Sequence, residues 1–210
     1  MISAGNDIVA LSAVDLQRTE LPAFYSKFIT KAEFALHEHS ALPFTTFVWL
    51  LWSVKESAYK YLKRLNNSLV FPPINIIVEQ LTLSDQTLDD NLRCDLLIDT
   101  QFIGVVVHNQ TSVYFRTLIN KDFIATTIGG DKVYWGIQNI VDANYKTQSD
   151  AVRLFALDAL GEIVTSDDLW IDKHADAGYP IVMHGQHPVD IPLSFAHHGS
   201  LVSYSFQIPK

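Results

Sequence analysis

The segment from residue 44 to residue 64 is the strongest constraint on how this chain can fold. Its apolar side chains recur every three or four residues, which is the spacing of one face of an α-helix. Two asparagines at 66–67 and two prolines at 72–73 then end the pattern. The sequence predicts one long helix here, with apolar positions Phe47, Leu50, Leu51, Val54, Ala58, Tyr61 and Leu62.

Two charged residues of this helix share a face. Residues four apart on a helix are neighbours, so Glu56 and Lys60 point the same way, with Trp52 one turn earlier. A carboxylate and an ammonium beside an aromatic ring can hold a metal ion and a phosphate at once. Taken alone, the pair is more simply interpreted as a solvent-exposed ion pair, and Trp52 as a core residue.

A second acidic residue stands near the start of the chain. Asp7 follows Gly5 and Asn6 within residues 2–11, a segment that we predict to be a short buried strand. By itself, Asp7 can equally be a turn residue. Together with Glu56 and Lys60 it suggests a site for a magnesium-bound pyrophosphate, because Mg²⁺ prefers carboxylate and phosphate oxygens as ligands.

The rest of the chain predicts further helices and many strands. Pro22 opens a helix over 23–28, and Thr30 caps another, with Glu33 at the capping-box position. After residue 73 the composition turns to β-branched and aromatic residues separated by polar or glycine turns, which favours strands. We expect hairpin turns at 109–110 and 129–131. The predicted strands are 74–81, 94–97, 102–108, 112–118, 123–128 and 133–137.

A polar connector at 138–150 leads into a second group of elements. We predict a helix over 149–161, capped by Ser149 or Asp150 and ended by Gly161. Strand segments follow at 169–173, 180–183 and 193–206, the last broken near 197–199. The chain is thus expected to have an α+β fold with two similar halves, 1–140 and 141–210. Each half would pack a helix on a mainly antiparallel sheet, and we suspect a pseudo-two-fold relation between them.

Charge and cysteine content narrow the function class. A net charge of −8 at pH 7 argues against non-specific nucleic-acid binding, which needs a basic face. The single cysteine, Cys94, excludes an internal disulfide and favours the cytosol. No uncharged apolar run reaches about 18 residues and no signal peptide is visible, so we expect a cytoplasmic protein without a membrane partner.

Several motifs resemble those of the 4′-phosphopantetheinyl transferase superfamily. Residues 5–9 resemble its Gly-x-Asp-Ile motif, and residues 52–60 its Trp-x-x-Lys-Glu-Ala/Ser-x-x-Lys signature, in the same order and with similar spacing. Residues 28–33 resemble its Phe-Leu/Phe-Thr-x-x-Glu element. Near the other end, residues 177–180 resemble its Gly-Lys-Pro turn and residues 193–198 its Ser-Ile-Ser-His-Ser strand end.

The chain also departs from the family pattern. In the two-domain, surfactin-type members the histidine-bearing half comes first, whereas here it follows the half with Asp7 and Glu56. Tyr179 stands where the family usually has a phosphate-binding lysine, and Ala196 replaces a serine before the histidine. Val9 stands where two-domain members often have a third acidic ligand. The small acyl-carrier-protein synthases bind their metal with one Asp and one Glu.

The resemblance implies an enzyme that moves phosphopantetheine from coenzyme A to a serine of an acyl or peptidyl carrier protein. Fatty-acid, polyketide and peptide synthesis all use such carriers, and we favour a role in fatty acid biosynthesis. The implied roles are as follows: Asp7 and Glu56 bind Mg²⁺, Glu56 and Lys60 are catalytic, and Lys60, His197, Tyr179 and Arg153 bind coenzyme A, with Lys146 a further candidate.

Three basic residues of the long helix are candidates for docking a partner. We expect Lys55, Lys63 and Arg64 to help dock an acidic carrier, a solvated helix face being the alternative for each. His197-His198 is a tight turn or a cleft edge. A monomer with two halves is favoured over an oligomer. The alternative functions are a catalytically inert relative that binds coenzyme A or a carrier, and a structural or interaction domain.

Overall fold

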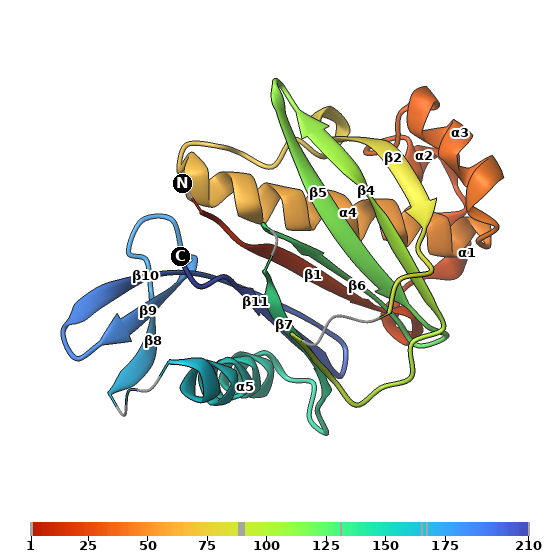
Figure 1. The fold of residues 1–210 in the computed structure, drawn as a ribbon. Coiled ribbons are helices and arrows are strands. Elements are labelled where there is room, and N and C mark those ends of the chain that lie inside the picture. Colours follow the sequence, from red (N-terminus) through yellow and green to blue (C-terminus); the bar gives the residue numbers. More distant parts are fainter. Residues whose placement is uncertain (1, 88–90, 131, 165, 167, 210) are drawn as a thin grey trace.

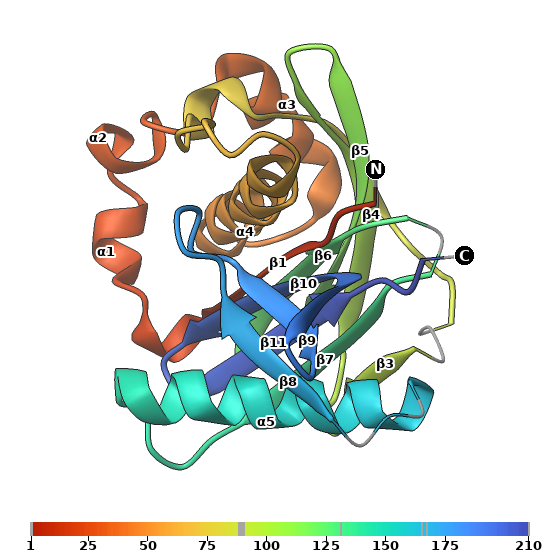
Figure 2. The ribbon, with the colours of Figure 1, turned by 90° about the vertical axis from the view of Figure 1, so that its left-hand side faces the viewer.

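The computed structural model describes residues 2–87, 91–130, 132–164, 166 and 168–209. Two sheets, one of five strands and one of six, pack against each other, and each carries one long helix (Figures 1 and 2). The layers therefore run helix, sheet, sheet, helix. This arrangement confirms the α+β fold class predicted from the sequence.

The first sheet carries the long helix α4 (Phe44–Leu65). The apolar side chains of α4 recur at helical spacing and form a stripe that packs onto the sheet. Phe47, Leu51 and Val54 consequently have no exposed surface. The strands of this sheet, in spatial order, are β1 (Gly5–Ala10), β6 (Phe123–Ile128), β5 (Thr111–Ile119), β4 (Thr100–His108) and β2 (Ile77–Leu83).

The second sheet carries α5 (Tyr145–Ile163). Val152, Ala156 and Leu160 repeat every four residues on α5 and form a buried core with this sheet. The strands, in spatial order, are β3 (Leu92–Cys94), β7 (Tyr134–Asn139), β11 (Leu201–Phe206), β10 (His187–His198), β9 (Pro180–His184) and β8 (Leu169–Lys173). The β3–β7 pairing is parallel, and the other pairings among the described strands are antiparallel.

Shorter helices lie near the amino-terminal end of α4 (Figure 1). They are α1 (Leu16–Thr19), α2 (Pro22–Tyr25) and α3 (Lys31–Ser40), with 3₁₀ turns η1 (Leu11–Ala13) and η2 (Pro73–Asn75) elsewhere. The capping box predicted at the start of α3 is confirmed. Thr30 Oγ1 accepts a hydrogen bond from the Glu33 amide at 3.2 Å, and the Glu33 carboxylate accepts one from the Thr30 amide at 2.8 Å.

The first strand, β1, joins the two sheets. It pairs with β6 along its own sheet, while one of its faces packs on β10 and β11 of the other. The Asn6 amide donates to Ser194 Oγ at 3.1 Å, and the Asn6 side chain donates to Ser203 Oγ at 3.0 Å. These bonds fix the position of β1 relative to the second sheet.

Lys55 lies inside the core of the first half. Its ammonium contacts the Glu33 carboxylate at 2.7 Å and donates to the carbonyls of Pro73 and Ile76, and neither charged side chain has any exposed surface. Burial lowers the pKa of Lys55, and the Glu33 charge opposes this shift. The expectation that Lys55 helps to dock a carrier is therefore wrong, because a buried ammonium cannot meet a partner.

The structure confirms one of the two predicted hairpin turns and contradicts the other. The Asn109 turn joins β4 to β5 as a hairpin, as expected. The hairpin predicted at 129–131 is wrong, because β6 pairs with β1 and β5 whereas β7 pairs with β11 and β3, so the chain crosses between sheets here. Asp131 itself lies outside the described residues.

The second long helix begins earlier than predicted. Asn144, and not Ser149 or Asp150, caps α5, because its side chain accepts a hydrogen bond from the Thr147 amide at 3.0 Å. The helix also continues past Gly161 to Ile163. A glycine is tolerated inside a helix at a modest cost, so it need not end one.

The six-stranded sheet draws on residues before the division expected at residue 140, since β3 and β7 belong to it. The assignment of domains to 1–140 and 141–210 and the pseudo-two-fold relation between them stay predictions. None of the described helices combines the length and the apolar composition needed to cross a lipid bilayer.

The Lys55–Glu33 pair generates a stability prediction. Lys55→Met leaves the Glu33 carboxylate buried without a counter-charge, so we expect it to lower the free energy of unfolding by about 3–5 kcal/mol. Glu33→Gln leaves the ammonium unpaired and is expected to be similarly harmful. The double variant should lose less than the sum of the two, because no isolated charge remains. Urea unfolding measures all three, and strict additivity would contradict the coupling.

Candidate functional site

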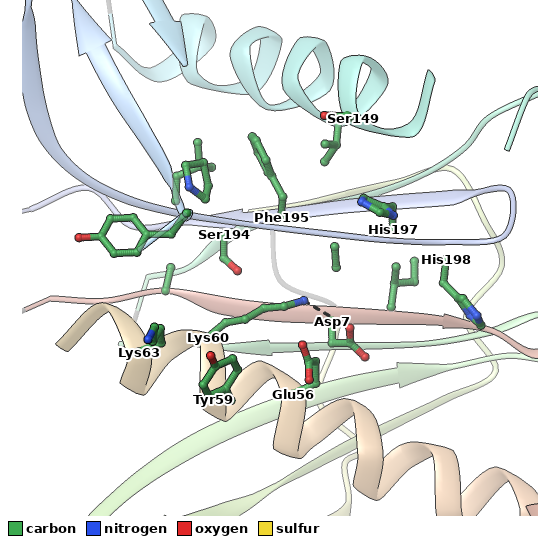
Figure 3. Close-up of a pocket in the computed structure, with 18 of the residues that line it drawn as sticks. Asp7, Glu56, Tyr59, Lys60, Lys63, Ser149, Ser194, Phe195, His197 and His198 are labelled. Carbon is green, nitrogen blue, oxygen red and sulfur yellow. Dashed lines mark hydrogen bonds and ion pairs between the residues drawn. The ribbon is translucent and has the colours of Figure 1, made fainter. Parts of the chain in front are cut away.

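A cavity of about 580 Å³ opens between β1 and α4 on one side and the second sheet with α5 on the other. Figure 3 shows that its walls come from β1, from the carboxyl-terminal part of α4, and from β10 and α5. Elements far apart in the sequence therefore meet at one site. The sequence-predicted residues among its lining are Asp7, Val9, Glu56, Lys60, Lys63, Arg64, Arg153, Tyr179, Ala196, His197 and His198.

The close approach of β1 to α4 positions the acidic part of the cavity. Gly5 lies so near the helix that a Cβ there would be 2.1 Å from the carbonyl oxygen of Ser57 and 2.7 Å from the amide nitrogen of Tyr61. Asp7 is two residues further along the strand and so points to the same side. Only glycine at position 5 allows this contact.

Asp7 is almost completely buried at the bottom of the cavity, with 12 % of its side chain exposed. Its Oδ1 contacts the Lys60 ammonium at 3.4 Å, and Lys60 also donates to the Asn6 carbonyl at 2.9 Å. Its Oδ2 is buried and has no hydrogen-bond partner among the described residues. Burial raises the pKa of Asp7, and the Lys60 charge opposes this rise.

Glu56 lies on α4, beside Asp7 of β1, and the two carboxyl groups lie close together in Figure 3. Burial raises the pKa of Glu56; the Lys60 charge lowers it and the Asp7 charge raises it. Two carboxylates in a low-dielectric site repel each other unless a cation lies between them. Together with the unpartnered Asp7 Oδ2, this donor set fits a divalent cation that prefers oxygen ligands.

The described residues contain no cluster of three or more metal-binding side chains. Asp7 and Glu56 would therefore leave most coordination positions of an octahedral ion to water or to phosphate. Mg²⁺ characteristically binds proteins in this way, through one or two carboxylates plus substrate phosphates. The apolar side chain of Val9 lines the same cavity and adds no ligand.

His197 and His198 come from the end of β10. Burial lowers the pKa of His197, and the nearby Lys60 charge lowers it further, so the ring is neutral at pH 7. The His197 ring meets the Tyr145 ring edge-on, with centroids 5.4 Å apart. His198 Nδ1 accepts a hydrogen bond from the Ala10 amide at 3.0 Å and so ties β1 to the second sheet.

The basic residues of the cavity differ in what they contact. Arg153 donates to the Ser149 carbonyl at 3.1 Å. Lys63 donates to the carbonyls of Asn67 and Leu69, which lie just beyond α4. Arg64 reaches across to the second half, as detailed below. Lys146 is exposed and is not part of the cavity lining, so the structure does not bring it to the site.

The sequence analysis assigned no role to several residues of the wall. Trp49 and Tyr59, the latter within the motif at 52–60, line the cavity on α4, three residues before Trp52 and three after Glu56, so helical spacing was a signal for both. Ser194 and Phe195, within the motif at 193–198, line it from β10. No local signal could show that Ser194 binds Asn6, because 188 residues separate them.

Residues 3–128 match the model of the 4′-phosphopantetheinyl transferase superfamily, which is more than half of the chain. The matched range contains Asp7, Glu56 and Lys60. No curated protein matches the chain.

The contact at Gly5 generates a prediction. Gly5→Ala must push α4 away from β1, because both nearest atoms belong to the helix backbone. We expect a loss of about 1–3 kcal/mol in the free energy of unfolding and weaker Mg²⁺ binding, measured by urea unfolding and calorimetry. Gly161→Ala is the matched control, since nothing lies within 4 Å of the added Cβ and the residue is helical. Equal effects of the two changes would contradict the proposed role of Gly5.

The half-buried charge of Glu56 generates a second prediction. A carboxyl whose pKa is raised in the folded state destabilises the fold as the pH rises above its usual, unfolded-state pKa, and the full cost is reached above the raised pKa. In metal-free buffer at pH 7, Glu56→Gln should therefore raise stability by about 1 kcal/mol, and this gain should vanish below the usual pKa of glutamate. Added Mg²⁺ should stabilise the wild type but not the variant in thermal unfolding. The control is Glu38→Gln at an exposed position, where a similar gain would contradict the prediction.

Proposed function

Because the chain belongs to the 4′-phosphopantetheinyl transferase superfamily, we propose that it transfers the 4′-phosphopantetheine group of coenzyme A to a serine of an acyl or peptidyl carrier protein in a Mg²⁺-dependent reaction. Membership of the superfamily supports phosphopantetheinyl transfer in general. The observation that carries the finer proposal is the pair of carboxyl groups of buried Asp7 and half-buried Glu56, beside the Lys60 ammonium in the cavity.

Asp7 and Glu56 would hold the metal. A bound Mg²⁺ supplies charge neutralisation at the attacked phosphorus and on the departing 3′,5′-ADP. Lys60, held by the Asn6 carbonyl and by Asp7, orients one phosphate oxygen of the diphosphate. Fixed charges that are already in place stabilise the transition state without reorganisation at the moment of reaction.

Glu56 is the proposed general base. It accepts the proton of the carrier serine, directly or through one water, as the new serine O–P bond forms and the P–O bond to 3′,5′-ADP breaks. Burial raises the pKa of Glu56 and so makes it a stronger base than an exposed glutamate. A metal ion held by Asp7 and Glu56 would oppose that rise and keep the carboxylate ionised.

The second-sheet side of the cavity would bind the nucleotide part of coenzyme A. His197, neutral at pH 7, offers a ring nitrogen for a hydrogen bond and a face for stacking. Arg153 and Tyr179 also line the cavity. Since one chain supplies all of these walls, the cavity supports a monomer as the working unit.

We further propose that the enzyme is of the holo-acyl-carrier-protein synthase type and acts in the cytoplasm on fatty-acid carriers. The order of its motifs supports this subtype, because the acidic half precedes the histidine-bearing half. With Lys55 buried and Arg64 held inside the cavity wall by the Pro180 and Leu193 carbonyls, docking of an acidic carrier is left to Lys63 among the three basic residues considered.

A catalytically inert relative that binds coenzyme A or a carrier is the second candidate. The observation that favours it is the pair of departures at Tyr179 and Ala196, both of which line the cavity. A structural or interaction domain is a third candidate, and it predicts no coenzyme A binding.

Mass spectrometry of carrier proteins tests the proposal. After incubation with coenzyme A and Mg²⁺, one of several acyl or peptidyl carriers should gain the mass of a phosphopantetheinyl group. Chelation of the metal should stop the reaction, and Glu56→Gln should slow it by about 10²-fold or more, whereas Glu38→Gln should not. Coenzyme A binding without transfer to any carrier would favour the inert relative. Absence of both would favour the structural domain.

A further inference from the structure

Arg64 continues the row of functional residues on α4. Glu56, Lys60 and Arg64 follow one another at four-residue intervals, so they share one face of the helix. Each step advances about 6 Å along the axis. Arg64 therefore faces the cavity about one helical turn beyond Lys60, on the side away from the two carboxyl groups.

The second half of the molecule holds the Arg64 guanidinium in place. Its Nη2 donates to the Pro180 carbonyl at 3.0 Å and to the Leu193 carbonyl, and the guanidinium lies over the Tyr179 ring at 4.2 Å from the centroid. Such stacking fixes the plane of the side chain and leaves its edge free. Among the described residues, no hydrogen-bond partner of Nη1 or Nε is found.

We propose that Arg64, stacked on Tyr179, supplies the phosphate-binding cation that position 179 lacks, and that it binds a phosphate group of coenzyme A. This inference rests on the proposed function. Tyr179 then acts as a positioning residue, because its ring orients the guanidinium and makes no phosphate contact of its own.

Charge and geometry support this assignment. Burial lowers the pKa of Arg64 to about 10, so the side chain keeps its charge at neutral pH. A guanidinium presents parallel N–H groups that match two oxygens of a phosphate, and such charge-assisted bonds are about twice as strong as neutral ones. Lys63 donates to backbone carbonyls at the end of α4, and Lys173 is exposed at the end of β8, so neither is held as Arg64 is.

Calorimetric affinities for coenzyme A test the inference. Arg64→Met should weaken binding about 10-fold, the loss of roughly one charged hydrogen-bonding partner. Tyr179→Phe keeps the ring and should stay within about 3-fold of the wild type, as should Lys173→Met, which removes one cavity charge that is not held. The decisive variant is Arg64→Met/Tyr179→Lys, which should recover affinity to within about 3-fold, because the charge returns from the other half.

The same titrations with 3′-dephospho-coenzyme A identify the phosphate. If Arg64→Met lowers the affinity for both ligands, Arg64 binds the diphosphate. If it lowers the affinity for coenzyme A alone, Arg64 binds the 3′-phosphate. Where Arg64→Met does not fold, Tyr179→Ala replaces it, since both carbonyl hydrogen bonds of Arg64 are kept while the stacking is lost. Weaker binding by Tyr179→Ala supports the inference.

Three results would overturn it: a loss in Arg64→Met no larger than in Lys173→Met, no recovery in the double variant, or unchanged affinity in Tyr179→Ala. The first two would make Arg64 a latch between the halves without a ligand role. A wild type that binds no coenzyme A at all is a different result, because it refutes the proposed function from which the inference starts.

Discussion

The site depends on two carboxyl groups and one ammonium that are held close together, with little access to water, where a strand meets a helix. Asp7 comes from β1, while Glu56 and Lys60 come from α4, so the strand and the helix must be held together against the repulsion of their own carboxyl groups. The apolar stripe of α4 supplies that force, because it is buried completely on the first sheet. The stability of the core is thus what keeps an unfavourable arrangement of charges in place.

A second level of support comes from the junction of the two sheets. Asn6 binds Ser194 and Ser203, and the Ala10 amide binds His198, so hydrogen bonds to the second sheet stand on both sides of Asp7. Arg64 adds another link from the end of α4. Hydrogen bonds therefore connect the acidic residues of the cavity to the residues of the second sheet, and a shift of β1 would move both groups.

Sequence reasoning succeeded where the signal was local. The long helix and the Thr30 capping box depend on residues within a few positions of each other. For the distant pair Asp7 and Glu56 the signal was the family motifs, and both residues line the cavity with Lys60. Sequence reasoning failed where the structure depends on contacts between residues that are far apart in the sequence. Lys55 was expected to be exposed because its partner Glu33 lies on another helix, and no hairpin joins β6 to β7 because β7 pairs with β11 in the other sheet. The bonds of Arg64 to Pro180 and Leu193 join residues more than 100 positions apart, and no pattern shows them.

The place of β1 has a consequence for biosynthesis. Its partner strand β6 begins at Phe123, and Ser194 lies 188 residues further along the chain than Asn6. As the polypeptide leaves the ribosome, β1 must wait with an unpaired edge while its neighbours are still being translated, and such edges invite association with other chains. Contacts of this sequence separation also form slowly. We therefore expect the chain to need chaperones most during the period before the second sheet has been translated.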